Sequence, residues 1–242
     1  MVSARSSQLG KSSASVRSGR PKANSASPRF YKLDGRPLTS WGDYGDILQH
    51  GLSWRGDRGL LELRRTGPFI PPITFPCYSS SDEVVLTTTT RERLEASGLN
   101  GFAFQAVKKT QIVNLPWHEW DLKARVPREY PKSGEPEDYL DMRRPNARVS
   151  QQMGDLWELV VPDTANIGVV PDVEHSSYQE QRLWRSTFQN YYFEVKSWNG
   201  ADVIRAATTN GQVHFVLVAE RGKLWFEENL GRYVKCYELR CI

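Results

Sequence analysis

The chain has 242 residues, of which 39% are hydrophobic and 25% are charged, and its formal net charge is +4. It contains no apolar run near the roughly 18–20 residues of a membrane-spanning helix, and its N-terminus lacks the apolar stretch of a secretory signal. The three cysteines argue against a disulfide framework and indicate a reducing compartment. We therefore expect a cytoplasmic globular protein with no membrane partner.

The positive charge is concentrated at the N-terminus. Residues 1–29 contain no acidic side chain and carry the basic residues Arg5, Lys11, Arg17, Arg20, Lys22 and Arg29. The rest of the chain holds 26 basic and 28 acidic residues, so the body is slightly acidic. Residues 1–28 have almost no large apolar side chains, which predicts a disordered tail. Nucleic acid is therefore an expected partner only weakly, through this tail.

The folded part is expected to begin near Phe30. Several glycines make residues 34–59 rich in loops, and residues 60–63 indicate a short strand. Residues 67–73 contain three prolines. They are expected to be extended, because proline lacks a backbone donor and clashes inside a helix.

A strand–helix–strand unit is predicted over residues 84–107. Residues 84–87 are rich in β-branched side chains, and Thr89 lies three residues before Glu92, which is the spacing of a capping box. The helix should run through Leu94 and end at Gly98, since glycine adopts the left-handed conformation that closes many helices. Residues 102–107 then read as the second strand.

A similar unit is predicted near the C-terminus. Residues 215–218 and 233–237 read as strands that flank a helix. In this alignment Arg221, Leu224 and Leu230 take the places of Arg91, Leu94 and Leu99. The offset is about 130 residues, with one extra residue in the second helix. Ancestral duplication and independent convergence both explain the similarity at this point.

The remaining segments complete the predicted organisation. Residues 157–161 and 191–198 read as strands, and Ser177 with Glu180 indicates a capping box that opens a helix through residue 188. The fold class is therefore α+β, with mixed or antiparallel sheets and few short helices. The predicted divisions are a tail (1–28), an N-terminal half (29–126), a Pro-rich acidic connection (127–148) and a C-terminal half (149–242).

One short motif has the pattern of a catalytic site. Glu194-Val195-Lys196, preceded by Asp172 or Asp163, matches the core of many Mg²⁺-dependent nucleases, where carboxylates hold the metal and lysine orients water. The same triplet is also what a half-exposed strand produces, and this is the main interpretation. The four histidines and three cysteines show no metal-ligand spacing, so no cofactor or metal is predicted.

Two aromatic and acidic segments are candidates for partner binding. Tryptophan supplies rigid contact area at interfaces, and acidic rims attract basic partners. The candidate residues are Trp117, Glu119, Trp120, Asp121, Glu135, Glu137, Asp138 and Asp141. The other interpretation, that the tryptophans are core residues and the acids solvate a loop, is the main one, because most tryptophans are largely buried.

Three groups of residues resemble a known family. They are Glu62–Pro76; then Leu86-Thr87, Arg91, Leu94-Glu95, Ser97-Gly98-Leu99 and Gly101-Phe102; and finally Ala219-Glu220-Arg221, Leu224, Glu227-Glu228 and Cys236. Over residues 30–121 and 155–242 the chain resembles immunity proteins of bacterial polymorphic toxin systems and the related myxobacterial group with paired Cys-x-x-Cys-Gly motifs. This chain has no Cys-x-x-Cys-Gly, so zinc binding is not carried over.

The resemblance implies a cytoplasmic protein that binds and blocks a co-encoded toxin. The slightly acidic body would suit a basic toxin, such as a nuclease. The alternatives are the Mg²⁺-dependent nuclease described above and a structural module whose basic tail contacts nucleic acid or an anionic surface. Sequence alone leaves the oligomeric state open.

Overall fold

A computed structural model of the chain describes residues 27–57, 59–77, 83–170 and 190–242. The predicted tail lies outside the described residues except for 27 and 28, and so do the predicted helix that begins near Ser177 and the candidate ligand Asp172.

The described residues form short strands and short helices. The strands are β1 (Phe30–Gly35), β2 (Leu52–Arg55), β3 (Leu61–Gly67), β4 (Ile73–Thr74), β5 (Val85–Thr87), β6 (Ala103–Ala106), β7 (Lys108–Asn114), β8 (Leu156–Val160), β9 (Asp163–Val169), β10 (Tyr191–Phe193), β11 (Val203–Ala207), β12 (His214–Ala219) and β13 (Val234–Cys241). The helices are α1 (Asp43–His50), α2 (Thr88–Glu95), α3 (Asp138–Asp141), α4 (Ala147–Gln152) and α6 (Glu220–Leu230), with 3₁₀ turns at η1 (Trp117–Glu119) and η3 (Val195–Ser197).

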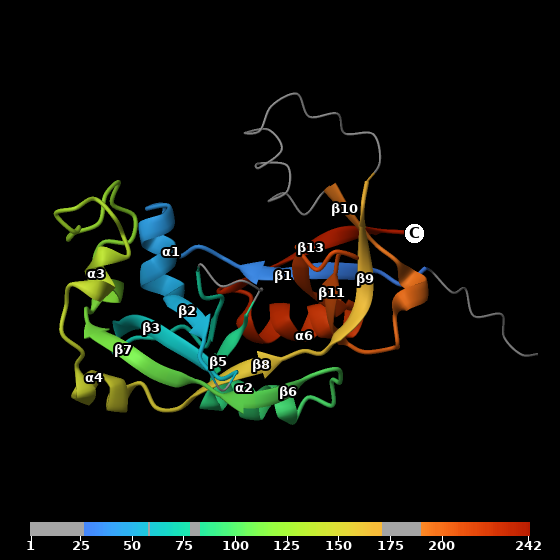
Figure 1. The fold of residues 1–242 in the computed structure, drawn as a ribbon, viewed down its shortest axis with the longest axis horizontal. Coiled ribbons are helices and arrows are strands. Elements are labelled where there is room, and N and C mark those ends of the chain that lie inside the picture. The colour runs from blue at the N-terminus through green and yellow to red at the C-terminus, as the bar shows by residue number, and fades with distance from the viewer. Residues whose placement is uncertain (1–26, 58, 78–82, 171–189) are drawn as a thin grey trace, which may run out of the picture.

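These strands form three sheets (Figure 1). Six strands close into a barrel in the order β1-β12-β11-β9-β10-β13, a second sheet has the order β4-β5-β8-β6, and a third has the order β2-β3-β7. The barrel and the third sheet contain parallel pairs, whereas all pairs of the second sheet are antiparallel. The predicted α+β class with mixed sheets and short helices is confirmed.

Both predicted strand–helix–strand units are present, and each has a third strand between its two strands. In the first unit, β8 lies between β5 and β6 and is antiparallel to both. In the second unit, β1 lies between β12 and β13 and is antiparallel to both. The two units therefore share one topology, in which the third strand follows the first unit in the chain and precedes the second unit.

The register shows that the units correspond at an offset of 132 residues, not about 130. Trp157 of β8 pairs with Leu86 and Ala106, and Tyr31 of β1 pairs with Val218 and Glu238, which are the same positions shifted by 132. The same shift places Phe226 opposite Leu94, and both are fully buried in one core cluster. The predicted alignment of Leu224 with Leu94 is wrong, since Leu224 is 48% exposed.

Equivalent cations cover the third strand in each unit. The guanidinium of Arg91 lies 4.1 Å from the ring centroid of Trp157, and the ammonium of Lys223, its equivalent, lies 5.2 Å from that of Tyr31. Each cation also forms an ion pair with a glutamate one helical turn later, Glu95 or Glu227. The shared topology does not by itself require these cation–ring contacts and ion pairs. The two units therefore correspond in their side-chain contacts as well as in their backbone.

Two local predictions need correction. The N-cap of α2 is Thr87, not Thr89: its hydroxyl accepts a hydrogen bond from the amide of Thr90 at 3.4 Å. The strand β5 ends at Thr87 and the helix begins at the next residue, so Thr89 is already helical. The predicted strand over 191–198 ends at Phe193 and continues as the turn η3.

Strand pairing crosses the predicted division into halves. β1 precedes residue 126 but pairs with β12 and β13, whereas β8 follows residue 148 but pairs with β5 and β6. The two units also share a core cluster that includes Tyr31, Leu94 and Phe226. The predicted connection contains α3 and the beginning of α4. The boundaries at 126 and 148 stay a prediction.

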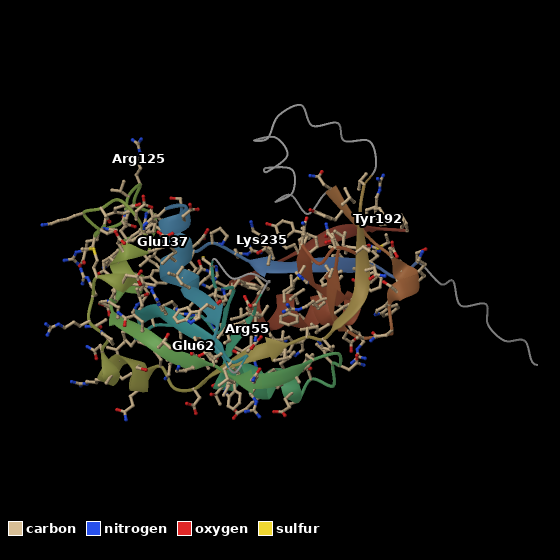
Figure 2. All side chains as sticks on the ribbon, viewed as in Figure 1. Arg55, Glu62, Arg125, Glu137, Tyr192 and Lys235 are labelled. Carbon is tan, nitrogen blue, oxygen red and sulfur yellow. The ribbon has the colours of Figure 1, made fainter. Side chains whose placement is uncertain are left out.

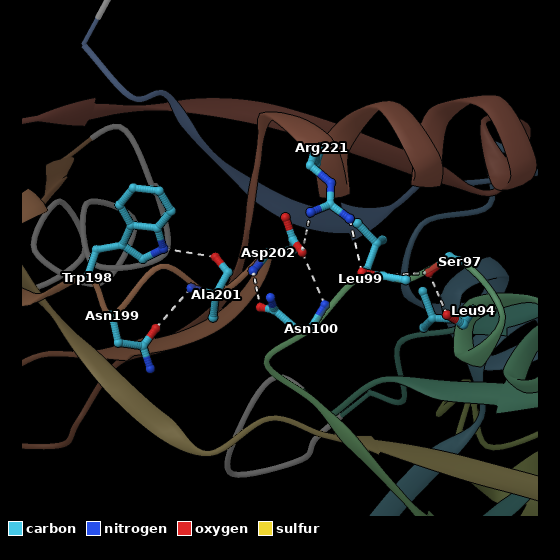
Figure 3. Close-up of polar contacts among 10 residues, drawn as sticks. Leu94, Ser97, Leu99, Asn100, Trp198, Asn199, Ala201, Asp202 and Arg221 are labelled. Carbon is cyan, nitrogen blue, oxygen red and sulfur yellow. Dashed lines mark hydrogen bonds and ion pairs between the residues drawn. The ribbon is translucent and has the colours of Figure 1, made fainter. Parts of the chain in front are cut away.

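A polar junction joins the loop after α2 to the second unit (Figure 3). The amide of Asn100 donates to Asp202 Oδ2 at 3.1 Å, and the amide of Asp202 donates to Asn100 Oδ1 at 3.0 Å. Arg221, at the start of α6, lies 3.6 Å from Asp202 and donates to the carbonyl of Gly98 at 3.0 Å. Because these bonds satisfy backbone groups on both sides, they fix the positions of the two units relative to one another.

Candidate partner-binding surface

The tryptophans predicted for partner binding lie mainly in the core. Trp117, in η1, is fully buried against Phe69 and belongs to a cluster with Tyr44 and Tyr139. Trp120 is half-buried and packs on the same cluster. The expectation that Trp117 forms part of a contact surface is therefore wrong, because α1 and the segment around α3 cover it.

The predicted acidic residues divide into exposed and constrained groups. Glu119, Asp121 and Glu135 are exposed. Glu137 and Asp138 are half-buried at the start of α3, and Asp141, at its end, forms an ion pair with Arg64. The two predicted segments do meet, since Trp117, Tyr139 and Leu140 belong to one core cluster. What the structure brings together is their apolar residues.

Residues 121–146, here called the outer segment, are held by hydrogen bonds from α1 and from the loop before it. Trp41 Nε1 donates to the carbonyl of Ala124 at 2.8 Å, and the hydroxyl of Tyr44 donates to the carbonyl of Glu129 at 2.8 Å. The Glu129 carboxylate accepts from Tyr139 at 3.0 Å and from Arg143 at 2.9 Å. The outer segment is therefore tied to the folded core although it contains little regular structure.

The outer segment exposes large apolar side chains. Val126 is 66% exposed, Tyr130 50% and Met142 74%. Among the described residues, the other large hydrophobic side chains with comparable exposure are Val169, Leu224 and Ile242, which lie on three separate elements or ends. Exposed apolar groups on an anchored segment are typical of protein interaction sites.

Helix α1, which holds the outer segment, has its own buried support at its C-terminal end. Arg65 Nη2 donates to the carbonyl of Gln49 at 3.1 Å, and the hydroxyl of Thr66 donates to the carbonyl of Leu48 at 3.2 Å. Burial lowers the pKa of the fully buried Arg65 to about 9. These carbonyls lack partners inside the helix, and a cation favours the negative end of the helix dipole.

A cavity of about 400 Å³ lies on the other side of α1. Its wall includes Asp34, Asp46, His50 and Cys77. His50 Nδ1 accepts a hydrogen bond from the amide of Phe75 at 3.2 Å, so the neutral ring carries its proton on Nε2. Burial, assisted by Arg65, lowers the pKa of His50 to about 3. Burial also raises the pKa of Asp46, with Asp43 assisting, and raises the pKa of Cys77 to about 12.

The candidate nuclease motif does not lie on a strand. Glu194 precedes η3, and its carboxylate is 3.8 Å from the ammonium of the exposed Lys196, which lies within that turn. Asp163 begins β9 beside Arg205, but its side chain is outside the described part, as is Asp172. Among the described residues, no group of three or more His, Cys, Asp or Glu is placed to hold a metal. The nuclease alternative stays a prediction.

Comparison with protein-family models, curated proteins and solved structures gives no match to this chain. The resemblance to immunity proteins therefore rests on the residues quoted above. Within the described residues, no helix has the length and apolar character needed to cross a membrane.

The cationic part of the outer segment was not predicted from the sequence. The outer segment, residues 121–146, contains six basic and six acidic side chains, but only acidic ones were among the residues predicted to bind a partner. The feature of the sequence that could have indicated this part is Val126. It is a β-branched apolar residue between Arg125 and Arg128, in a Pro-rich stretch without periodicity. An apolar residue that serves neither a helix nor a strand has no structural use in such a loop unless it is packed, and here it is exposed.

Proposed function

We propose that this chain is an immunity-type binding protein that neutralises a co-encoded toxin in the cytoplasm by direct contact. The observation that carries the binding role is the outer segment, an irregular segment tied to the core at Ala124 and Glu129 that exposes Val126, Tyr130 and Met142. The toxin as partner comes from the resemblance in the residues around α2 and α6.

The physics of the outer segment supports this role. A blocking protein needs a preformed surface that buries on the order of 1,600 Å² in total, with a few apolar, aromatic or arginine anchors. Because the hydrogen bonds from Trp41 and Tyr44 already order the segment, little additional ordering entropy is lost on binding. Exposed Met and Tyr are enriched in such surfaces.

The direct test is binding to the toxin domain encoded by the neighbouring gene. We expect the purified chain to form a stable complex with that domain in calorimetry. Met142→Asp should weaken the complex about 10-fold or more, which is about 1.4 kcal/mol. Leu224→Asp is the matched control, since Leu224 is also exposed but lies on α6.

Two results would count against the proposal. Absence of any complex with the wild-type chain would reject the immunity role. A complex that loses affinity with Leu224→Asp but not with Met142→Asp would move the contact surface to α6.

A further inference from the structure

One exposed part of the outer segment is a short tip with fixed ends. The tip comprises residues 125–128, Arg-Val-Pro-Arg, and lies between the two anchored carbonyls of Ala124 and Glu129. Proline at 127 restricts the backbone further by fixing its own φ. In Figure 2 the side chain of Arg125 points away from the body of the molecule. The tip is therefore presented outward by contacts that do not involve its own side chains.

The tip carries positive charge that no acidic residue of the described ranges neutralises. Arg125 and Arg128 are exposed and take part in no ion pair among the described residues. The same holds for other exposed cations of the region: Lys123, Lys132, Arg144 and Arg148. Among the exposed acidic residues of the outer segment, Glu129 is paired with Arg143 and Asp141 with Arg64. This leaves Asp121 and Glu135 outside the ion pairs of the described residues.

Between the two arginines lies an apolar group that is open to solvent. Val126 is 66% exposed, although a valine side chain gains about 1.5–3 kcal/mol when it is fully buried. Guanidinium groups form paired hydrogen bonds with carboxylates, and their planar geometry makes those bonds directional. The tip therefore combines two carboxylate-binding groups with one group that gains from entering an apolar pocket.

We propose that the tip at residues 125–128 enters a cleft of the partner protein, and that this cleft is rimmed by carboxylates around an apolar pocket that receives Val126. This inference rests on the proposed function. It reverses the charge expected for the partner, whose contact site would be acidic and not basic. A toxin whose active site depends on aspartate or glutamate would present such a cleft.

A discrete acidic cleft fits the tip better than a nucleic acid does. The body apart from residues 1–29 holds 28 acidic against 26 basic side chains, which disfavours a polyanion at long range but leaves short contacts with individual carboxylates favourable. Nucleic-acid contacts also use exposed aromatic faces, whereas the ring of Tyr130, the nearest aromatic residue in sequence, packs 4.6 Å from that of Tyr44.

The test compares charge reversal at the tip with reversal elsewhere. The tip variant is Arg125→Glu/Arg128→Glu. The control variant is Arg232→Glu/Arg240→Glu, which changes the net charge by the same amount at exposed sites in and before β13. Affinity for the toxin domain of the neighbouring gene is measured by calorimetry at two salt concentrations. A 20-nucleotide single-stranded DNA serves as a second probe. Within the described part of the chain neither pair of arginines forms an ion pair, so both variants should fold, which circular dichroism verifies.

We expect the tip variant to bind the toxin domain at least 100-fold more weakly, with a reduced dependence on salt. The control variant should stay within about 3-fold of the wild type. If the wild-type chain binds the toxin domain and the tip variant binds equally well, the inference is wrong and the proposed function stands. If the tip variant loses binding to DNA but not to the toxin domain, the tip recognises nucleic acid instead. If the wild-type chain does not bind the toxin domain, both proposals fail.

Discussion

Replacing Gly101 with alanine is expected to destabilise the protein by about 2–5 kcal/mol. Gly101 has φ +96°, in the region that disfavours side chains, and a Cβ there would lie 2.2 Å from the carbonyl oxygen of Val203. The backbone conformation costs a non-glycine residue about 1–2 kcal/mol, and overpacking adds about 1–3 kcal/mol. The clash falls beside the bonds between Asn100 and Asp202, so it acts on the junction of the two units.

Gly98 provides a matched control three residues earlier. It has φ +71°, but a Cβ at this position would meet nothing within 4 Å. Gly98→Ala should therefore cost only about 1–2 kcal/mol, from the backbone conformation alone. Urea unfolding of the two variants measures the difference. Equal destabilisation would show that the close approach of Gly101 to Val203 is absent in solution.

Acidification is expected to destabilise the chain strongly through His50. Its pKa is lowered from 6.5 to about 3 in the folded state, so the unfolded chain binds a proton between these values that the folded chain does not. The free energy of unfolding should therefore fall by about 1.4 kcal/mol for each pH unit below 6.5, and the loss should end near pH 3. At pH 4.5 the contribution of His50 alone is about 2–3 kcal/mol.

The variant His50→Asn isolates this contribution. The asparagine carbonyl can accept the hydrogen bond of the Phe75 amide, and asparagine does not titrate. The measurement is urea unfolding of both proteins from pH 7.5 to pH 4, where the variant should lose less stability than the wild type. The comparison is needed because Asp46, whose pKa is raised by burial, acts in the opposite direction. Parallel curves for the two proteins would mean that His50 is not buried as a neutral ring.

The sequence predicted those parts of the fold that depend on neighbouring residues. In the first unit the strands and helix follow from a β-branched run, a threonine cap and Gly98, which are local signals. The helix α6 of the second unit has no side-chain cap. Residues 157–161 were predicted as a strand, but the places of β1 and β8 between the strands of each unit depend on pairing over more than 50 residues, which no local pattern encodes. The offset was misjudged because Leu224 was matched by residue type, whereas Phe226 is the residue that is buried.

The candidate site was predictable in position but not in character. The sequence pointed to residues 117–121 and 135–141, and both segments pack on the cluster that supports the outer segment. Burial of Trp117 depends on α1, about 70 residues earlier, and the pairing of Asp141 depends on Arg64 of β3. Sequence alone does not show that Asp141 is paired or that Trp117 is buried. It also does not show that the arginines of the tip have no ion pair among the described residues.

Protection of growing cells tests the central claim most directly. Cells that express the toxin domain of the neighbouring gene should stop growing, and coexpression of this chain should restore growth to the rate seen without the toxin. Continued arrest, in cells where the chain accumulates in folded form at levels above the toxin, would contradict a neutralising role.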